Sequence, residues 1–283
     1  MFEKNLYETD RSRKPPPRSV VKRRVVIPSN LFVGEDKKLA TFRLGLLARF
    51  ISIFRVEEVV VYGPPNSLVV GVLKYAETPQ YLRRKLIPLF PSLKHVGIIP
   101  PLQSPHHPAS LKGKGFLCEY REGIVIGKTT DSVLVDVGFK EPIQVVSIAK
   151  VGERVTVKLT DPPQIVGKRD VPYYWGFSLR VVPNLRSALK VCKKYLKVAT
   201  SRLGEPIRNV ANSLVSDSYK FGRIAIFFGE REKGLLDLAL EEGLDPYKVF
   251  DYIVNLVPYQ GSFTIRTEEA VPLALAILEY LID

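Results

Sequence analysis

The segment LVPYQGSFTIRTEEAVPLALAILEYL (Leu256–Leu281) is the most informative part of this sequence. It begins with a proline, a glycine and a short polar run, which predict a loop. Thr267 then resembles a helix N-cap, because the two acidic residues after it suit the positive end of a helix dipole. The predicted helix, Glu268–Leu281, is apolar around most of its girth. We therefore expect it to pack under other elements or against a second subunit.

Apolar runs and amphipathic stretches alternate over much of the chain. Val25–Pro28 and Val59–Tyr62 are predicted to be buried strands, and Leu39–Phe54 and Pro79–Phe90 are predicted to be helices. This alternation predicts an α/β fold with a parallel sheet. The same pattern returns after Tyr173, with strands predicted at 178–182, 195–199 and 223–228 and helices at 185–192, 232–242 and 268–281.

Residues 109–169 follow a different pattern, in which short alternating strands are separated by glycine or aspartate turns. The strands are predicted at 123–128, 132–137, 143–148 and 154–159. Several short strands at this spacing indicate a small OB-like β-barrel. Because the α/β pattern resumes afterwards, we predict that the barrel is inserted into a main domain formed by residues 25–108 and 170–283.

The formal net charge of +13 over 283 residues favours an anionic partner, and nucleic acid is the usual one. The charge is uneven, at +10 for residues 1–108, +2 for 109–170, +7 for 171–222 and −6 for 223–283. RNA is therefore expected to meet the first lobe and the 171–222 stretch. A soluble protein with a basic surface is the simpler alternative.

Residues 1–24 are rich in arginine and lysine around the triplet Pro15–Pro17, and they are predicted to form a flexible or extended basic tail. Such a tail either binds RNA by displacing counterions or only adds solubility. The sequence leaves both functions open.

Several classes of protein are disfavoured. Cys118 and Cys192 are not in CxxC pairs, so we expect reduced thiols in a cytoplasmic protein. There is no apolar run of the ~20 residues that a membrane span needs, and no signal peptide is predicted. His106 and His107 are adjacent and chelate poorly, so no metal is expected. Dinucleotide and Walker-type phosphate loops are missing, as is an obvious nucleophile, which argues against a hydrolase or ligase.

Three loops follow predicted strands at their carboxyl ends, where α/β sheets place ligands. They are Thr200–Gly204, Gly229–Gly234 and Val257–Arg266. In the second loop, Gly229 permits a close backbone approach to a ligand, while Glu230 suits a helix N-terminus. Taken alone, this loop fits an ordinary strand–turn–helix connection better than a ligand site.

These loops resemble the SPOUT superfamily of RNA methyltransferases. IAIFFGEREKGL (Ile224–Leu235) resembles its second motif, and Leu256–Leu281 resembles its third. One branch, with human and archaeal members, also carries a TSxxG loop, a PLxSPHH element and a PGQGSxTIRTEEA-like stretch. Here these are Thr200–Gly204, Pro101–His107 and Pro258–Ala270, with Tyr259 in place of a glycine. The resemblance covers about residues 25–283.

The resemblance implies a SPOUT-type sheet with a trefoil knot in about residues 195–283, whose loops hold S-adenosyl-L-methionine. Carried over residue by residue, the implied cofactor pocket consists of Thr200, Ser201, Gly229, Leu256, Pro258, Gln260, Gly261, Thr264, Ile265 and Ala270.

The implied reaction is methyl transfer to a base ring nitrogen, with a uridine in rRNA as the expected target. A uridine imide must lose its proton, so a general base or a cation that stabilises the oxyanion is useful. Arg266 and Arg202 are the candidates for charge stabilisation, and Glu230 is the candidate base or sulfonium partner. Each of the three is also explained by a surface or structural ion pair.

The expected partners are RNA and a second copy of the chain, because SPOUT enzymes are typically homodimers. The candidate RNA contacts are Arg23, Arg24, Arg43, His106 and His107, although the two histidines fit a structural loop equally well. The alternative function is that of a non-catalytic RNA-binding assembly factor on the same fold, with which Tyr259 is compatible.

Overall fold

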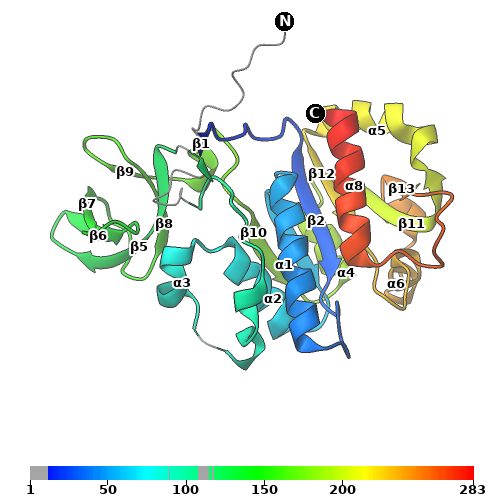
Figure 1. Cartoon of the computed structure of the whole chain (residues 1–283). Helices are drawn as coiled ribbons and strands as arrows, with labels where there is room; N and C mark the ends of the chain where they lie inside the picture. The colour runs from blue at the N-terminus through cyan, green and yellow to red at the C-terminus, as the bar shows by residue number, and fades with distance from the viewer. Residues whose placement is uncertain (1–11, 89, 108–114, 117) are drawn as a thin grey trace, which may run out of the picture. The chain divides into compact units, whose positions relative to one another are not determined.

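The computed structural model describes residues 12–88, 90–107, 115–116 and 118–283, and the chain divides into two compact units (Figure 1). The larger unit is formed by Arg18–Glu77, Leu89–Leu102 and Gly176–Asp283. The smaller unit is formed by Met1–Pro17, Thr78–Pro88 and Gln103–Trp175. Residues 1–11 of the predicted tail and residues 109–114 of the predicted barrel segment lie outside the described residues.

A six-stranded parallel sheet forms the centre of the larger unit, which confirms the α/β fold. Its order is β10 (Ser178–Val182), β3 (Glu58–Tyr62), β2 (Lys22–Pro28), β12 (Arg223–Phe227), β11 (Leu196–Pro206) and β13 (Tyr252–Asn255). Val25, Val26 and Ile27 of β2 are fully buried. Continuous burial of this kind is expected of a parallel strand that is covered on both faces.

Helices cover this sheet. They are α1 (Lys37–Ile53), α2 (Ser67–Glu77), α4 (Leu185–Val191), α5 (Ile207–Phe221), α6 (Leu235–Glu241), α7 (Pro246–Val249) and α8 (Thr267–Ile282), with short 3-10 turns at Pro91–Leu93 and Val96–Ile98. Helix α1 packs between α2 and α8 (Figure 1). On β2 and β3, Val26 and Val60 pack against Leu185 of α4 and Leu235 of α6. None of the described helices is long and apolar enough to cross a membrane.

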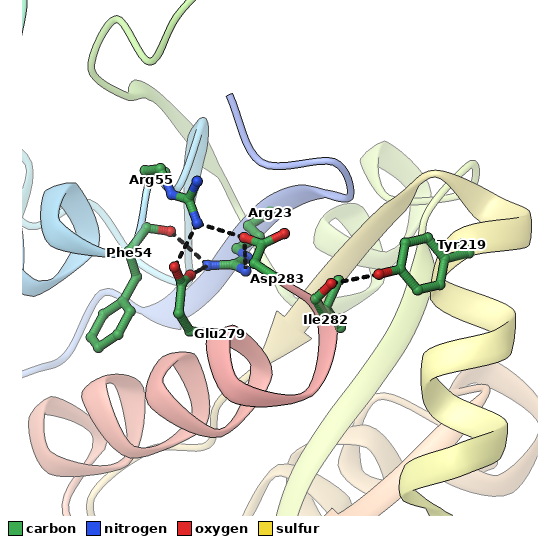
Figure 2. Close-up of polar contacts among 7 residues, drawn as sticks. All are labelled: Arg23, Phe54, Arg55, Tyr219, Glu279, Ile282 and Asp283. Carbon is green, nitrogen blue, oxygen red and sulfur yellow. Dashed lines mark hydrogen bonds and ion pairs between the residues drawn. The ribbon is translucent and has the colours of Figure 1, made fainter. Parts of the chain in front are cut away.

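A cluster of charged residues fixes the C-terminal end of α8 to β2 and to the end of α1 (Figure 2). The fully buried side chain of Arg23 donates to Glu279, to Asp283 at 2.6 Å and to the carbonyl of Phe54 at 3.0 Å. Arg55 donates to the same two carboxylates, at 2.5 and 2.6 Å. Strand β2 begins at Lys22, so residues 22–24, which were predicted to belong to the basic tail, are part of the sheet.

The smaller unit is built on a five-stranded antiparallel sheet. Its order is β7 (Ile143–Val146), β6 (Ser132–Asp136), β5 (Tyr120–Lys128), β8 (Arg154–Lys158) and β9 (Gln164–Val166). Valines from four of these strands form its core. The unit also contains α3 (Gln80–Leu86), a 3-10 turn at Lys168–Asp170, and the parallel pair of β1 (Ser12–Arg13) and β4 (Gly115–Phe116).

The buried carboxylate of Glu122 organises the smaller unit. It accepts hydrogen bonds from Thr156 at 2.8 Å and from the indole of Trp175, and it pairs with Arg154 at 2.6 Å. A buried carboxylate is tolerated when it is this fully satisfied. The hydroxyl of Tyr81 on α3 donates to the backbone carbonyl of Glu122 at 2.6 Å, so α3 belongs structurally to this unit.

Candidate functional site

Three loops meet at the carboxyl ends of β11, β12 and β13. The hydroxyl of Thr200, at the first loop, donates to the carbonyl of Phe227 at the end of β12, at 2.9 Å. The hydroxyl of Thr267, at the start of α8, donates to the carbonyl of Gly229 at 2.8 Å. A side chain of the first loop and the first residue of α8, which follows the third loop, thus both bind the backbone that leads out of β12.

The first loop is a bulge in β11. Thr200 and Glu205 both pair with Val254 of β13, so residues 201–204 project out of the ladder. A Cβ on Gly204 would lie 2.6 Å from the carbonyl carbon of Val254. Real Cβ atoms do not approach backbone so closely, and glycine is therefore required where the bulge returns to the strand.

The second loop is a tight turn. A Cβ on Gly229 would lie 2.6 Å from the backbone nitrogen of Leu235, and the amide of Glu230 donates to the carbonyl of Lys233 at 2.9 Å. The tight turn alone therefore explains why residue 229 is a glycine, without a ligand that approaches its backbone. Glu230 is half-buried on this turn.

The third loop is folded around Gln260. Its side-chain amide donates to the carbonyls of Ser262 at 2.8 Å and Phe263 at 3.0 Å. The side-chain amide of Asn255, at the end of β13, donates to the carbonyl of Arg202 at 2.8 Å and so ties the third loop to the first. Such side-chain-to-backbone bonds fix a loop that lacks a regular ladder.

All ten predicted cofactor residues lie on these three loops or on the first turn of α8. Gly261 and Thr264 are exposed, whereas Leu256, Pro258 and Ile265 are half-buried. Exposed loop residues therefore lie in the same segment as half-buried apolar side chains, a mixture of polar and apolar groups that small-molecule sites use.

Two exposed aromatic side chains on the third loop stack against arginines. The guanidinium of Arg202 lies 5.5 Å from the ring centre of Phe263 and donates to its carbonyl at 3.2 Å. The guanidinium of Arg208 lies 5.6 Å from the ring centre of Tyr259. Arg202, a predicted catalytic residue, thus joins the first and third loops at the surface.

Arg266, the other predicted catalytic arginine, belongs to a cluster centred on Glu35. The Glu35 carboxylate accepts from Arg43 at 2.6 Å, from Arg231 at 3.1 Å and from Arg266 at 3.5 Å. Glu268 adds a second carboxylate, 3.8 Å from Arg43 and 4.0 Å from Arg266. Burial raises the pKa of Glu268, and Glu269 adds to this rise, while Arg43 and Arg266 oppose it.

The sequence interpretation missed Glu35, Arg231 and Glu268 as members of this cluster. Arg231 and Glu268 lie inside the two motifs that carry the resemblance, so their positions were available as a signal. Glu35 lies in a turn after β2, and no local pattern distinguishes it from a solvated acid.

The structure corrects the RNA-contact prediction for Arg23 and Arg24. Arg23 is buried in its carboxylate cluster (Figure 2). Arg24 pairs with Glu58, donates to the carbonyl of Val191 at 2.7 Å and lies 3.9 Å from the ring centre of Tyr195. Both guanidiniums are used inside the protein, which leaves them no surface for a phosphate.

His106 is also buried, and this corrects its assignment to RNA. Its Nδ1 lies 3.1 Å from the Ser104 hydroxyl, and its ring packs 4.4 Å from that of His107 and 6.1 Å from that of Trp175. His107 is half-buried. Among the described residues, no group of three or more His, Cys, Asp or Glu side chains is arranged to hold a metal ion.

The chain is thus an α/β protein whose three loops lie at the carboxyl ends of parallel strands, the edge at which such sheets generally bind ligands. Residues 22–278 match the family model described as "Putative RNA methyltransferase", and the chain belongs to this RNA methyltransferase family.

The names of two relatives agree with this family, and a third relative is uncharacterized. The chain is 30% identical over 326 residues to the 28S rRNA (uridine-N(3))-methyltransferase of Drosophila melanogaster, covering 98% of this chain and 65% of that protein. It is 29% identical to the human protein of the same name, covering 90% of this chain and 77% of that one. An uncharacterized protein of Haloarcula marismortui is 34% identical, covering 90% and 97%. The chain thus spans less than two thirds of the fly protein's length.

Among solved structures, the chain is similar to the SpoU methyltransferase AviRb from Streptomyces viridochromogenes in complex with AdoMet. The TM-score is 0.38 and the identity is 10%, and the match covers 93% of this chain and 58% of AviRb.

Proposed function

We propose that this chain is an S-adenosyl-L-methionine-dependent methyltransferase that modifies a ring nitrogen of uridine, N3, in ribosomal RNA. The observation that carries the proposal is the folded QGSFTIRTEEA loop (Gln260–Ala270) at the carboxyl ends of β11–β13, in a chain that belongs to an RNA methyltransferase family. The names of the fly and human relatives support uridine N3 as the acceptor.

The proposed cofactor site is the group of three loops. The half-buried side chains of Leu256 and Ile265 suit an adenine ring, and the exposed backbone of Gly261 and Thr264 suits its polar edge. Nothing lies within 4 Å of a Cβ built on Gly261, so there is room beside this backbone. When bound, S-adenosyl-L-methionine supplies an electrophilic methyl group.

The chain's own residues have the remaining tasks. They must hold the uridine in line with the methyl group, exclude water and remove the N3 proton. Arg266 is proposed to stabilise negative charge on the uridine, and Glu230, beside the cofactor loops, is proposed as the base. Arg202 is proposed to hold the RNA through the surface that it forms with Phe263.

The finer fold assignment is also a proposal: a trefoil knot in about residues 195–283 and an inserted OB-like barrel in residues 109–169. After β11 the chain forms β12 on one side of that strand and returns to form β13 on its other side. This return supports a crossing of the chain in this segment. The antiparallel β5–β9 sheet supports the barrel.

A homodimer is proposed from an apolar groove between α5 and α8. The groove has a volume of about 320 Å³ and is lined by Ile207, Arg208, Ala211, Ala276, Ile277, Tyr280 and Leu281. Tyr280 is 89% exposed in the single chain. Apolar side chains that line an exposed groove are typical of an association surface, and a second copy that buries its own α5 and α8 fits it.

Mass-spectrometric nucleoside analysis of rRNA and tRNA from a strain that lacks the gene tests the function. A methylated uridine should be missing from rRNA, restored by the wild-type gene and by Lys248→Ala, and not by Arg266→Ala. Lys248 is an exposed cation on α7 and serves as the control for loss of one positive charge. Unchanged rRNA nucleosides in the deletion strain would contradict the proposal.

Calorimetry distinguishes the proposed enzyme from the alternative function, that of an RNA-binding assembly factor without catalysis. The proposed enzyme should bind S-adenosyl-L-methionine, whereas the assembly factor should not bind it even at millimolar concentration. The exposed Tyr259, which replaces a glycine of the resembling branch, is the feature that favours this alternative.

A further inference from the structure

The Glu35 cluster contains more positive than negative charge. Three guanidiniums, from α1, from the turn after β12 and from the residue before α8, converge on the carboxylate of Glu35, and the carboxylate of Glu268 lies farther away, at 3.8 and 4.0 Å from two of them. The side chains of Arg231 and Arg266 are 53% and 38% exposed, whereas that of Glu35 is only 15% exposed. The cationic groups therefore reach solvent while the carboxylate is enclosed between them.

The geometry of Glu35 matches that of a bound phosphodiester. Its Oε2 accepts from Arg43, and its Oε1 accepts from Arg231 and Arg266. The two non-bridging oxygens of a phosphodiester present the same pair of acceptors, and planar guanidiniums bind both kinds of anion in the same way. A phosphate would therefore find the three donors already gathered.

The backbone around Glu35 allows its side chain to leave the cluster. It lies in a turn closed by its own backbone bonds, with the amide of Glu35 donating to the carbonyl of Phe32 at 3.1 Å. Helix α1 has a separate N-cap, since the carboxylate of Asp36 accepts from the amide of Leu39 at 2.9 Å. A change of side-chain rotamer at Glu35 thus requires no movement of β2 or α1.

The position of the cluster links it to the proposed active site. Arg231 is two residues beyond Gly229, and Arg266 directly precedes Thr267, whose hydroxyl binds the carbonyl of Gly229. A phosphate held here would lie at the edge of the loops that carry the proposed cofactor site.

We propose that Arg43, Arg231 and Arg266 form a phosphodiester-binding site for the RNA substrate, which the carboxylate of Glu35 occupies when RNA is absent. RNA binding then exchanges one anion for another, and Glu35 turns toward solvent. The proposal rests on the proposed function only in taking RNA as the source of the phosphate.

The test measures the binding of a fluorescent ten-nucleotide oligouridylate by anisotropy between 50 and 200 mM KCl, without cofactor. Glu35→Gln should bind more tightly than the wild type, because it no longer competes for the arginines. Its log–log salt slope should steepen by about 0.7, the value for one net phosphate contact to single-stranded nucleic acid, because in the wild type the phosphate only replaces the Glu35 carboxylate. Over this fourfold change in salt, that slope corresponds to about a 2.6-fold greater loss of affinity.

The matched control is Asp245→Asn, which removes one negative charge from an exposed pair with Lys248 on α7 and keeps a side chain that can cap this helix. It should change the slope less than Glu35→Gln. Equal affinities and slopes for the two variants would overturn the proposal. Weaker binding by a folded Glu35→Gln protein would also overturn it, because Glu35 would then be holding the arginines in their binding geometry.

Arg231→Gln provides a second test that does not depend on the stability of the Glu35 variant. Because Arg231 is exposed, the variant should fold, bind more weakly and lose about 0.7 from the slope, relative to Lys248→Gln. Equal slopes for these two variants would refute the site. A lack of methylation would contradict only the proposed function, because oligouridylate binding is measured separately from catalysis.

Discussion

Gly204 and Gly261 lie on the same group of loops but in different surroundings. A Cβ on Gly204 would meet the backbone of Val254 and Ile253 at 2.6 and 2.8 Å, whereas a Cβ on Gly261 would meet nothing within 4 Å. Gly204→Ala should therefore lower the free energy of unfolding by about 1–3 kcal/mol, the usual cost of overpacking. Gly261→Ala should stay within about 0.5 kcal/mol of the wild type. Urea unfolding measures both variants, and equal stabilities would contradict the close approach of β11 and β13.

The role of a single residue was predictable where its neighbours in sequence determine it. The start of α8 was predicted to within one residue because the acids after Thr267 signal a helix N-terminus, although the N-cap is Arg266 and Thr267 is the first helical residue. Arg23 was misassigned because the basic run around it suggests a solvated arm, while the carboxylates that bury it come from Glu279 and Asp283 at the other end of the chain. Glu35 was missed for the same reason, since its partners come from three separate elements.

The Arg23 cluster at the C-terminal end of α8 should contribute measurably to the stability of the fold (Figure 2). Arg23→Met leaves two carboxylates facing a single remaining arginine, Arg55. Removing the arginine should cost about 2–3 kcal/mol, because Asp283, at 11% exposed, stays largely desolvated, whereas solvent partly screens Glu279, at 36% exposed. Urea unfolding of Arg23→Met should show this loss, and the neighbouring exposed variant Lys22→Met should not. The double variant Arg23→Met/Glu279→Leu should recover part of the loss, and a double variant no more stable than Arg23→Met would argue against coupling.

The helices and strands differ in how clearly their sequences predict them. Strands β2, β3 and β12 were predictable because continuous apolar runs have few alternatives in a parallel sheet. Helix α5 was missed although Ile207, Val210, Ala211 and Leu214 recur at helical spacing, so its sequence did carry a signal. Strand β13 was missed because it has four residues and depends on β11 for its pairing.

At the scale of the whole molecule, net charge is distributed unevenly along the chain. Residues 223–283 carry a net charge of −6, whereas residues 171–222 carry +7. The acidic part contains α8 and the third loop, so phosphate contact there depends on local arginine clusters such as that around Glu35. A broad basic surface is therefore expected elsewhere, which agrees with the roles proposed for α8 beside the cofactor and in subunit association.

The proposed homodimer makes the last prediction. If a second copy covers the α5–α8 groove, Tyr280→Asp places a charge in an apolar interface and should convert a dimer into a monomer, because an unpaired charge is costly to bury. Tyr247→Asp, at a tyrosine that is 77% exposed on α7, should leave the dimer intact. Sedimentation velocity measures both variants. The proposal that α8 forms an association surface would be contradicted if the wild type is a monomer. It would also be contradicted if Tyr280→Asp forms a dimer as stable as that of Tyr247→Asp. The helix would then be held by its buried apolar side chains, by the buried arginine cluster and by the Tyr219 hydroxyl, which donates to the carbonyl of Ile282 at 2.5 Å.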